Sequence, residues 1–135
     1  MSAESTVAES TASREAALQG RLTFLDNGPD AAAINIYGGE RPSSPADTPV
    51  GAVMATIPLK VPAGEVANGV LTLQAAEPGL ITITGTATWA RVTNAAGLVA
   101  FDMAVGDMNS AANCKLSTVD LLAGGLVVLI SATLS

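Results

Sequence analysis

The sequence predicts a mainly β protein, an antiparallel β-sandwich or jelly-roll-like domain with one N-terminal helix. Three observations support this fold class. After residue 29 the apolar pattern changes from a helical period to a period of two. Turn residues recur about every 8–12 positions, which is the spacing of sandwiches and barrels. The chain has 135 residues, of which 49 % are apolar, so it is long enough for one domain with a real core.

The N-terminal region divides into an arm and a helix. Residues 1–12 are small and polar, without an aromatic, and form an arm that cannot bury enough apolar area to fold alone. Residues 13–135 are expected to form the helix and the single β-sandwich domain. The helix ends near Leu25, because the DNGP sequence at 26–29 stops it. Residues 6–9 (TVAE) have capping-box spacing, which permits an earlier start. One helical face carries Val7, Leu18, Leu22 and Leu25.

Seven or eight extended segments follow the helix. Three prolines between residues 40 and 49 predict a loop, and Pro58 and Pro62 bracket a short piece that is typical of a sheet edge. The last segment is apolar enough to be buried on both faces. The expected strands are 34–37, 50–57, 69–75, 81–89, 99–105, 114–118 and 126–134.

The segment 81–89 has the clearest alternation in the chain. An apolar face opposite a threonine face predicts a sheet with one buried side, and Gly85 predicts a bend within this strand. Trp89 is expected to be the largest side chain of an otherwise aliphatic core. The predicted core residues are Trp89, Ile81, Ile83 and Phe101. The threonine face consists of Thr82, Thr84, Thr86 and Thr88.

Charge and composition exclude several classes of function. The chain has 12 acidic and 6 basic residues, a net charge of −6, which argues against nucleic acid and anionic membranes as direct partners. There is no histidine, so histidine triads and histidine-ligated metals are excluded. The N-terminus lacks a basic region followed by an apolar run, so we expect synthesis in the cytoplasm without a signal peptide.

The remaining candidates for chemistry are carboxylates and one cysteine. Asp102 with Asp107, or Glu65 with Glu77, could form an acid–base pair, but nothing in their spacing brings them together. The segment 102–109 offers oxygen ligands without the spacing of a calcium loop. Cys114 has no histidine to activate it and is interpreted as a small buried thiol. We therefore expect no catalytic residue, no metal and no cofactor.

The surface is expected to bind other proteins. Charged residues are only 13 % of the chain, and a surface of small, uncharged side chains is poorly protected against association. The arm and the threonine face are the candidates for this contact. The predicted interface residues are Thr6, Val7, Thr82, Thr84, Thr86 and Thr88.

Several motifs resemble a family of small proteins from tailed bacteriophages and prophages. They are the IxIYGGxRP pattern at 34–42, the strand at 67–72, the GTATWARVTNAAG run at 85–97 and the AGGxVxI pattern at 123–130. The resemblance covers about residues 14–135. These motifs are signatures of strands and turns, so they identify a family more firmly than a role.

The resemblance implies a non-enzymatic structural protein of the virion. The leading interpretation is a capsid decoration or cement protein that binds the major capsid protein and copies of itself, and so reinforces the head shell. A neck, collar or tail- or fibre-associated adaptor is the first alternative. A host-surface glycan-binding module is the second, although the chain has few aromatic residues to form a sugar platform.

Overall fold

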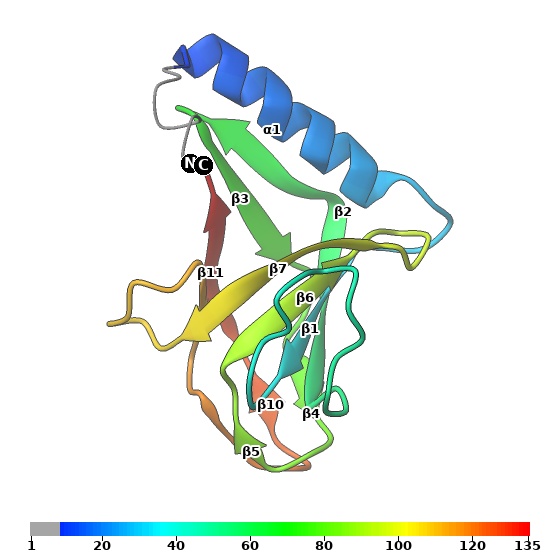
Figure 1. The fold of residues 1–135 in the computed structure, drawn as a ribbon, viewed down its shortest axis with the longest axis vertical. Coiled ribbons are helices and arrows are strands. Elements are labelled where there is room, and N and C mark those ends of the chain that lie inside the picture. The colour runs from blue at the N-terminus through cyan, green and yellow to red at the C-terminus, as the bar shows by residue number, and fades with distance from the viewer. Residues whose placement is uncertain (1–8) are drawn as a thin grey trace.

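The fold is mainly β with one helix, as the sequence predicts. The computed structural model describes residues 9–135, in which helix α1 (Thr11–Asp26) precedes eleven strands (Figure 1). The strands are β1 (Ala33–Tyr37), β2 (Ala55–Ala67), β3 (Val70–Ala75), β4 (Gly79–Ile81), β5 (Gly85–Thr86), β6 (Trp89–Thr93), β7 (Val99–Gly106), β8 (Cys114–Leu116), β9 (Asp120–Leu121), β10 (Leu126–Val127) and β11 (Leu129–Leu134).

Seven of the strands close into a barrel. Their order is β1-β6-β7-β8-β11-β3-β2, and pairing between β1 and β2 closes the ring. β4 and β10 extend the sheet beyond β2, while β5 and β9 form a separate two-stranded ribbon. Every pair is antiparallel except β7 with β8, which run parallel. The sandwich or jelly-roll arrangement expected from the turn spacing is not confirmed, because turn spacing is the same for a sheet that closes on itself.

Strand β2 closes the barrel because it pairs with different strands along its 13 residues. Its first half lies between β1 and β4, and its second half pairs with β3, with a register shift between Leu59 and Gly64. The extended piece expected between Pro58 and Pro62 belongs to β2, and it lies where the pairing of this strand is interrupted, because pairing with β1 ends at Pro58 and pairing with β3 resumes only at Gly64. The shifted register leaves Pro62 outside the ladder, where its missing N–H is tolerated.

Helix α1 lies across one end of the barrel, at the top of Figure 1. Its N-cap is Ser10, whose hydroxyl accepts a hydrogen bond from the Ser13 backbone N–H. The helix therefore begins at Thr11; the expected cap at 6–9 lies mostly outside the described residues, as does Val7. Leu18, Leu22 and Leu25 are buried, so the predicted apolar face closes this end of the barrel.

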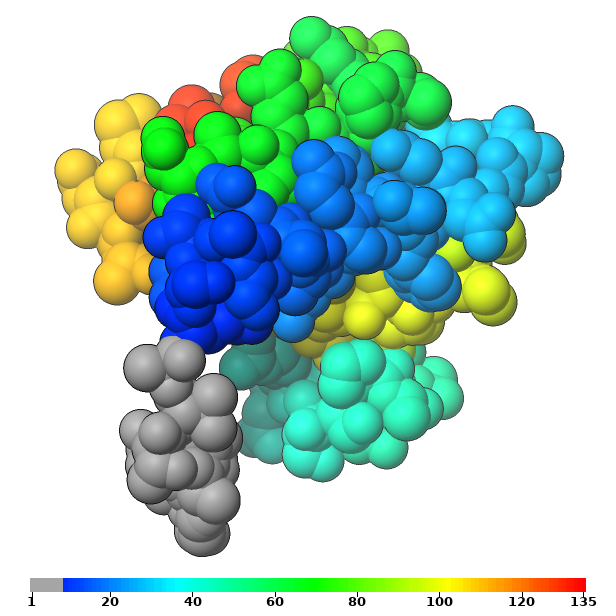
Figure 2. Space-filling model, turned by 90° about the horizontal axis from the view of Figure 1, so that it is seen from above, coloured from blue at the N-terminus to red at the C-terminus, as the bar shows by residue number. Residues whose placement is uncertain are grey.

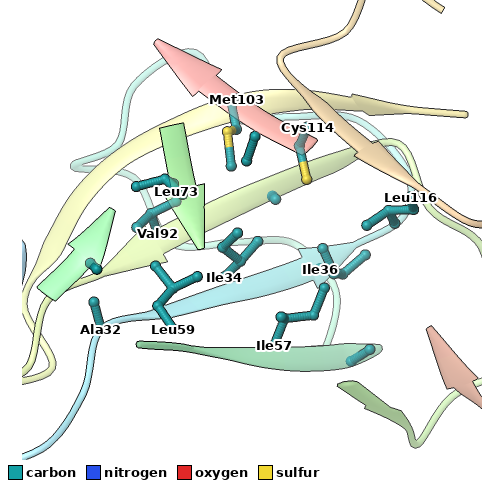
Figure 3. Packing of buried hydrophobic residues seen from close by; sticks show 14 of the residues in the cluster. Ala32, Ile34, Ile36, Ile57, Leu59, Leu73, Val92, Met103, Cys114 and Leu116 are labelled. Carbon is teal, nitrogen blue, oxygen red and sulfur yellow. The ribbon is translucent and has the colours of Figure 1, made fainter. Parts of the chain in front are cut away.

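The barrel interior is aliphatic. Side chains from β1, β2, β3, β6, β7 and β8 converge on it, as Figure 3 shows. Cys114 is fully buried among them, as expected of a small buried thiol. The residues labelled there are Ala32, Ile34, Ile36, Ile57, Leu59, Leu73, Val92, Met103, Cys114 and Leu116.

Three predicted strands differ from the observed ones. The strand expected at 50–57 begins only at Ala55 and continues to Ala67 as β2. The segment 81–89 is not one strand: it comprises the end of β4, the short β5 and the start of β6. Threonine hydroxyls in this segment bind backbone groups of other loops, which competes with continuous strand pairing. The last segment, 126–134, is buried on one face only, since Val127 is fully buried while Leu126 and Val128 are exposed.

Candidate functional site

The most elaborate polar arrangement lies on the outer wall of the barrel. Arg91 on β6 and Asp102 on β7 are direct cross-strand partners, so their side chains share one face. The Arg91 Nε donates to Asp102 Oδ1 at 2.8 Å and Nη2 donates to Oδ2 at 3.0 Å, which makes a bidentate pair. Both side chains are only 6 % exposed. This hydrogen bonding raises the pKa of Arg91 above its usual value, so the guanidinium stays charged.

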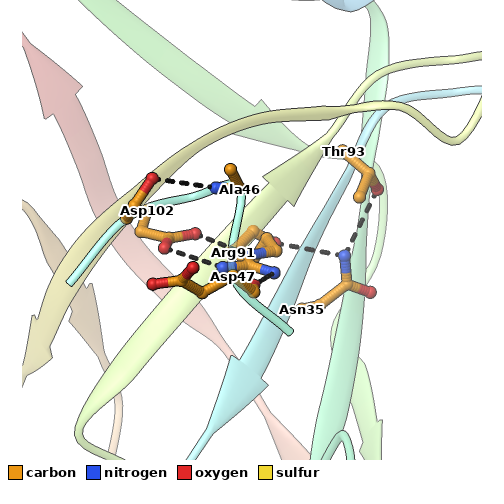
Figure 4. A network of polar contacts seen from close by, with 7 residues as sticks. Asn35, Ala46, Asp47, Arg91, Thr93 and Asp102 are labelled. Atoms are coloured by element: carbon orange, nitrogen blue, oxygen red, sulfur yellow. Dashed lines mark hydrogen bonds and ion pairs between the residues drawn. The ribbon is translucent and has the colours of Figure 1, made fainter. Parts of the chain in front are cut away.

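The loop 38–54, which connects β1 to β2, covers this pair. The remaining Arg91 donor, Nη1, binds the Asp47 backbone carbonyl at 2.7 Å (Figure 4). The Asp47 carboxylate itself accepts a hydrogen bond from the Ser43 hydroxyl within the loop. Arg91 therefore holds the loop against the wall through a main-chain oxygen.

Asn35 extends the network toward β2. Its amide nitrogen donates to the Arg91 carbonyl at 3.1 Å and to the Thr93 hydroxyl at 3.2 Å, while its amide oxygen accepts from Thr56. In the described part of the chain, no buried side-chain nitrogen or oxygen lacks a hydrogen-bond partner. The hydrogen bonds of this arrangement hold the loop 38–54 and the neighbouring strands together.

An aromatic pair completes the wall under the loop. The rings of Tyr37 and Trp89 stack with centroids 4.5 Å apart at 11°, and the Arg91 guanidinium lies 5.4 Å from the Trp89 ring centre. The Trp89 indole N–H donates to the Gly38 carbonyl. Burial raises the pKa of Tyr37, so its hydroxyl stays protonated.

The predicted core residues divide into three groups. Trp89 is buried, but the inner-face placement is wrong: its neighbours Ala90 and Val92 fill the barrel, and Trp89 belongs to the outer wall with Arg91. Ile81 is buried and Phe101 is half-buried against the core. Ile83 is 41 % exposed, so its core assignment is also wrong; the chain bends there instead of continuing a strand.

The four threonines of the predicted interface are exposed, but they do not form a flat strand face. Thr82 donates to the Met54 carbonyl, Thr84 accepts from the Ala123 N–H, and Thr88 donates to the Gly39 carbonyl at 2.6 Å. Thr86 lies in the β5–β9 ribbon. Three of these hydroxyls therefore fasten neighbouring loops. The other two predicted interface residues, Thr6 and Val7, lie outside the described residues.

Two of the four carboxylate candidates have structural partners, and within residues 9–135 no hydrogen bond joins the members of either proposed pair. Asp102 is paired with Arg91, and the Asp107 carboxylate accepts from the Asn109 backbone N–H within the loop after β7. Glu65 lies on β2 opposite Thr72, whereas Glu77 lies in the turn before β4. Across residues 9–135 no group of three metal-binding side chains is brought together.

The thiol of Cys114 is equally unsuited to nucleophilic chemistry in the folded protein. It is fully buried on β8 among aliphatic side chains. This burial raises the pKa of Cys114 to about 12, so the thiolate is not formed near neutral pH.

Sequence reasoning missed a groove beside the helix. α1 lies between β2–β3 on one side and β7 on the other, as seen from above in Figure 2. On the β7 side a hollow of about 430 Å³ is lined by Ala17, Gly20, Arg21, Phe24, Ala100 and Phe101. Ala17 and Gly20 could have indicated this hollow in the sequence, because small side chains leave space beside a helix. They lie away from the apolar face of α1, so the helical pattern predicts that they face solvent.

The comparisons with known proteins identify no relative. No family model, no curated protein and no solved structure matches this chain. Among the described residues, no helix has both the length and the apolar character needed to cross a bilayer.

Proposed function

We propose that the chain is a non-enzymatic structural protein of a tailed-bacteriophage virion, and specifically a capsid decoration or cement protein. Its partners would be the major capsid protein and other copies of itself. The resemblance of residues 14–135 to small phage proteins motivates this proposal. A protein of this kind acts through its surface and its rigidity, and features of the structure support each part.

The observation that carries the proposal is the apolar character of the exposed surface. Twelve large apolar side chains are exposed in the described part of an acidic chain that has few charges. Burial against a neighbouring protein contributes roughly 25 cal/mol per Å² of apolar area, and repetition over many sites multiplies that gain. These residues are Phe24, Val50, Val61, Leu80, Ile83, Leu98, Val99, Met108, Leu122, Leu126, Val128 and Ile130.

Rigidity comes from closure of the barrel. A ring of seven strands removes most free strand edges, α1 closes one end, and Arg91 holds the 38–54 loop to the wall. A cement protein needs this property, because a body that deforms easily cannot resist the outward pressure of packaged DNA.

Burial of the aromatic residues disfavours the glycan-binding alternative. A sugar platform needs exposed aromatic faces, but Trp89 and Tyr37 are buried and stacked on each other beneath the loop. The chain has four aromatic residues, and only Phe24 has an exposed side chain, with an exposed fraction of 39 %.

Copy number on purified particles tests the proposal and separates it from the neck, collar or tail alternative. Particles from a host that encodes the chain are resolved on a stained gel, and the band is quantified against the major capsid protein. Several hundred copies per particle support the shell assignment, whereas about a dozen or fewer indicate a neck or tail position. Absence of the chain from particles overturns the virion proposal.

A further inference from the structure

Two Asn-Gly pairs stand at turns of the fold. Asn27-Gly28 follows α1, and Asn68-Gly69 joins β2 to β3. An asparagine followed by glycine is prone to deamidation, because glycine has no side chain to hinder attack of its backbone nitrogen on the preceding side-chain amide. Both asparagines are exposed, so access of water does not distinguish them. The backbone contacts of the two glycines do.

The Gly69 nitrogen is held in place. Gly69 is buried, and its N–H donates to Glu15 Oε2 at 2.9 Å. Asn68 has a φ of 54° in a two-residue hairpin turn between the paired ends of β2 and β3. Attack requires rotation about the Asn68 Cα–C bond and loss of the Gly69 proton, so the turn and the bond to Glu15 must both break. The carboxylate also opposes removal of this proton, because the resulting anion would face a negative charge.

The Gly28 nitrogen has no such restraint. Gly28 is exposed, and within residues 9–135 its N–H has no hydrogen-bond partner. On either side, the Asn27 and Asp30 N–H groups donate to backbone carbonyls, and Pro29 has no N–H to donate. Rotation about the Asn27 Cα–C bond therefore breaks no hydrogen bond of the reacting nitrogen.

The fold requires the glycine that makes this pair reactive. Gly28 has a φ of 149°, and a Cβ at this position would overlap the backbone of Ala95 and Ala96. The turn that ends α1 and its close approach to the loop after β6 both depend on the absence of a side chain. A bulkier residue, which would slow the attack on Asn27, cannot enter here unless the turn moves.

We propose that Asn27 is a site of spontaneous deamidation in the folded protein, and that Glu15 protects Asn68. The Gly28 nitrogen loses its proton to hydroxide and bonds to Asn27 Cγ. The bond from Cγ to the side-chain nitrogen breaks, and that nitrogen leaves as ammonia after taking a proton from water. Water then adds to one of the two carbonyls of the succinimide ring and opens it to aspartate or isoaspartate. Water is the only co-reactant, and nothing is oxidised or reduced.

The product places a new carboxylate at the C-terminal end of α1. The helix dipole disfavours negative charge there, and the chain already carries a net charge of −6. Isoaspartate also lengthens the main chain by one methylene and so displaces Gly28 from its contact with Ala95. The modified chain should therefore melt at a lower temperature than the unmodified one.

Peptide mapping of the folded full-length chain tests the site. The chain is incubated at mildly alkaline pH, and samples are digested with trypsin and analysed by mass spectrometry against an unincubated control. Cleavage after lysine and arginine, except before proline, places Asn27 in the peptide 22–60 and Asn68 in the peptide 61–91. Fragment ions locate the modified residue within each peptide. Asn27 should deamidate at least about tenfold faster than Asn68.

Variants of Glu15 separate protection from sequence. Glu15→Ala removes the acceptor for the Gly69 N–H and should speed deamidation of Asn68 at least about threefold, with the rate at Asn27 unchanged. Glu15→Gln is the matched control, because its amide oxygen can still accept this hydrogen bond. Circular dichroism shows whether each variant is folded. If Glu15→Ala does not fold, wild type unfolded in urea provides the comparison, since the two rates should then converge.

Three outcomes overturn the inference. They are an Asn27 that stays intact in the folded chain, equal rates at the two sites in the folded chain, and an unchanged rate at Asn68 once Glu15→Ala or urea has released the Gly69 N–H. The inference goes beyond the virion proposal and can fail separately from it, because the reaction is a property of the isolated chain and does not depend on copy number in particles.

Discussion

The Tyr37 and Trp89 rings lie nearly parallel, 4.5 Å apart, on the outside of the barrel and not within it. They are cross-strand partners on β1 and β6, and the 38–54 loop removes them from water. The outer wall thus has a small core of its own, in which the aromatic stack adjoins the Arg91–Asp102 pair. The hydrogen bond from the Trp89 indole N–H to the Gly38 carbonyl links this stack to the loop.

Trp89→Ala should destabilise the fold by about 3–5 kcal/mol, because it removes the largest fully buried side chain and half of the stack. Urea unfolding followed by circular dichroism measures the change. Wild-type tryptophan emission should be blue-shifted in the folded protein. An emission maximum typical of full water exposure in native buffer would refute the burial of Trp89 under the loop.

Removal of one member of the buried ion pair should be more harmful than removal of both. Arg91→Leu leaves the Asp102 carboxylate buried without a counter-charge, and a loss of about 3–5 kcal/mol is expected. The double variant Arg91→Leu, Asp102→Leu should be less destabilised than Arg91→Leu alone. A double-mutant cycle in urea provides the coupling, and additive effects would contradict a direct pair.

Stability should fall at alkaline pH in part through Cys114. The pKa of its thiol is about 12 in the folded protein and 9.0 without the protein environment, so between these values the unfolded chain loses a proton that the folded chain keeps. The unfolding free energy therefore decreases as pH rises from about 9 to 12, by up to about 1.4 kcal/mol per pH unit. Urea titrations of wild type and Cys114→Ala at about pH 7, 9 and 10.5 isolate this contribution, which the variant should lack.

Substitution by alanine should have opposite effects on stability at two glycines. A Cβ on Gly64 would overlap the Thr72 carbonyl across the β2–β3 ladder, so Gly64→Ala should unfold or strongly destabilise the protein. Gly20 lies on the exposed face of α1, where an added methyl group would meet no heavy atom within 4 Å, and Gly20→Ala should stabilise by about 0.5–1 kcal/mol. Thermal unfolding of both variants checks the pair, with a reversed order contradicting the β2–β3 register.

Deletion of residues 2–8 should leave the melting temperature of the β domain nearly unchanged. The deletion retains Ser10, which caps α1, and Glu9, whose carboxylate accepts from the Ser13 hydroxyl. Attachment to particles should weaken, since the polar arm is proposed to add contacts with the capsid or a neighbouring copy. A large drop in melting temperature would instead assign the segment to the domain's own fold.

The sequence predicts the elements better than their arrangement. Period-two alternation locates most strands, and the stop signal at 26–29 places the end of α1 within one residue. The alternation of apolar and polar residues does not show which face of a strand a neighbouring loop will cover. It therefore predicts that Trp89 lies in the barrel interior, whereas this side chain is buried on the outer wall of the barrel. Closure of the barrel depends on pairing between β1 and β2, which is a property of register and twist and not of either strand's residues.

The same limit applies to the candidate sites. The sequence presents Asp102 as a possible acid–base residue, because its partner Arg91 is eleven positions away and is identified only by the β6–β7 register. The bare face of residues 126–130 reads as buried for a similar reason, since an apolar run looks the same whether its own domain or another molecule covers it.

The position of β11 also determines when the chain can fold. This strand fills the gap between β3 and β8, so the ring stays open until residue 134 has been synthesised. Until then a nascent chain presents the unpaired edges of β3 and β8, and the pairs that close the ring join distant parts of the sequence. Completion of the barrel therefore waits for β11 during biosynthesis, and the incomplete chain is the form most exposed to aggregation and to cellular chaperones.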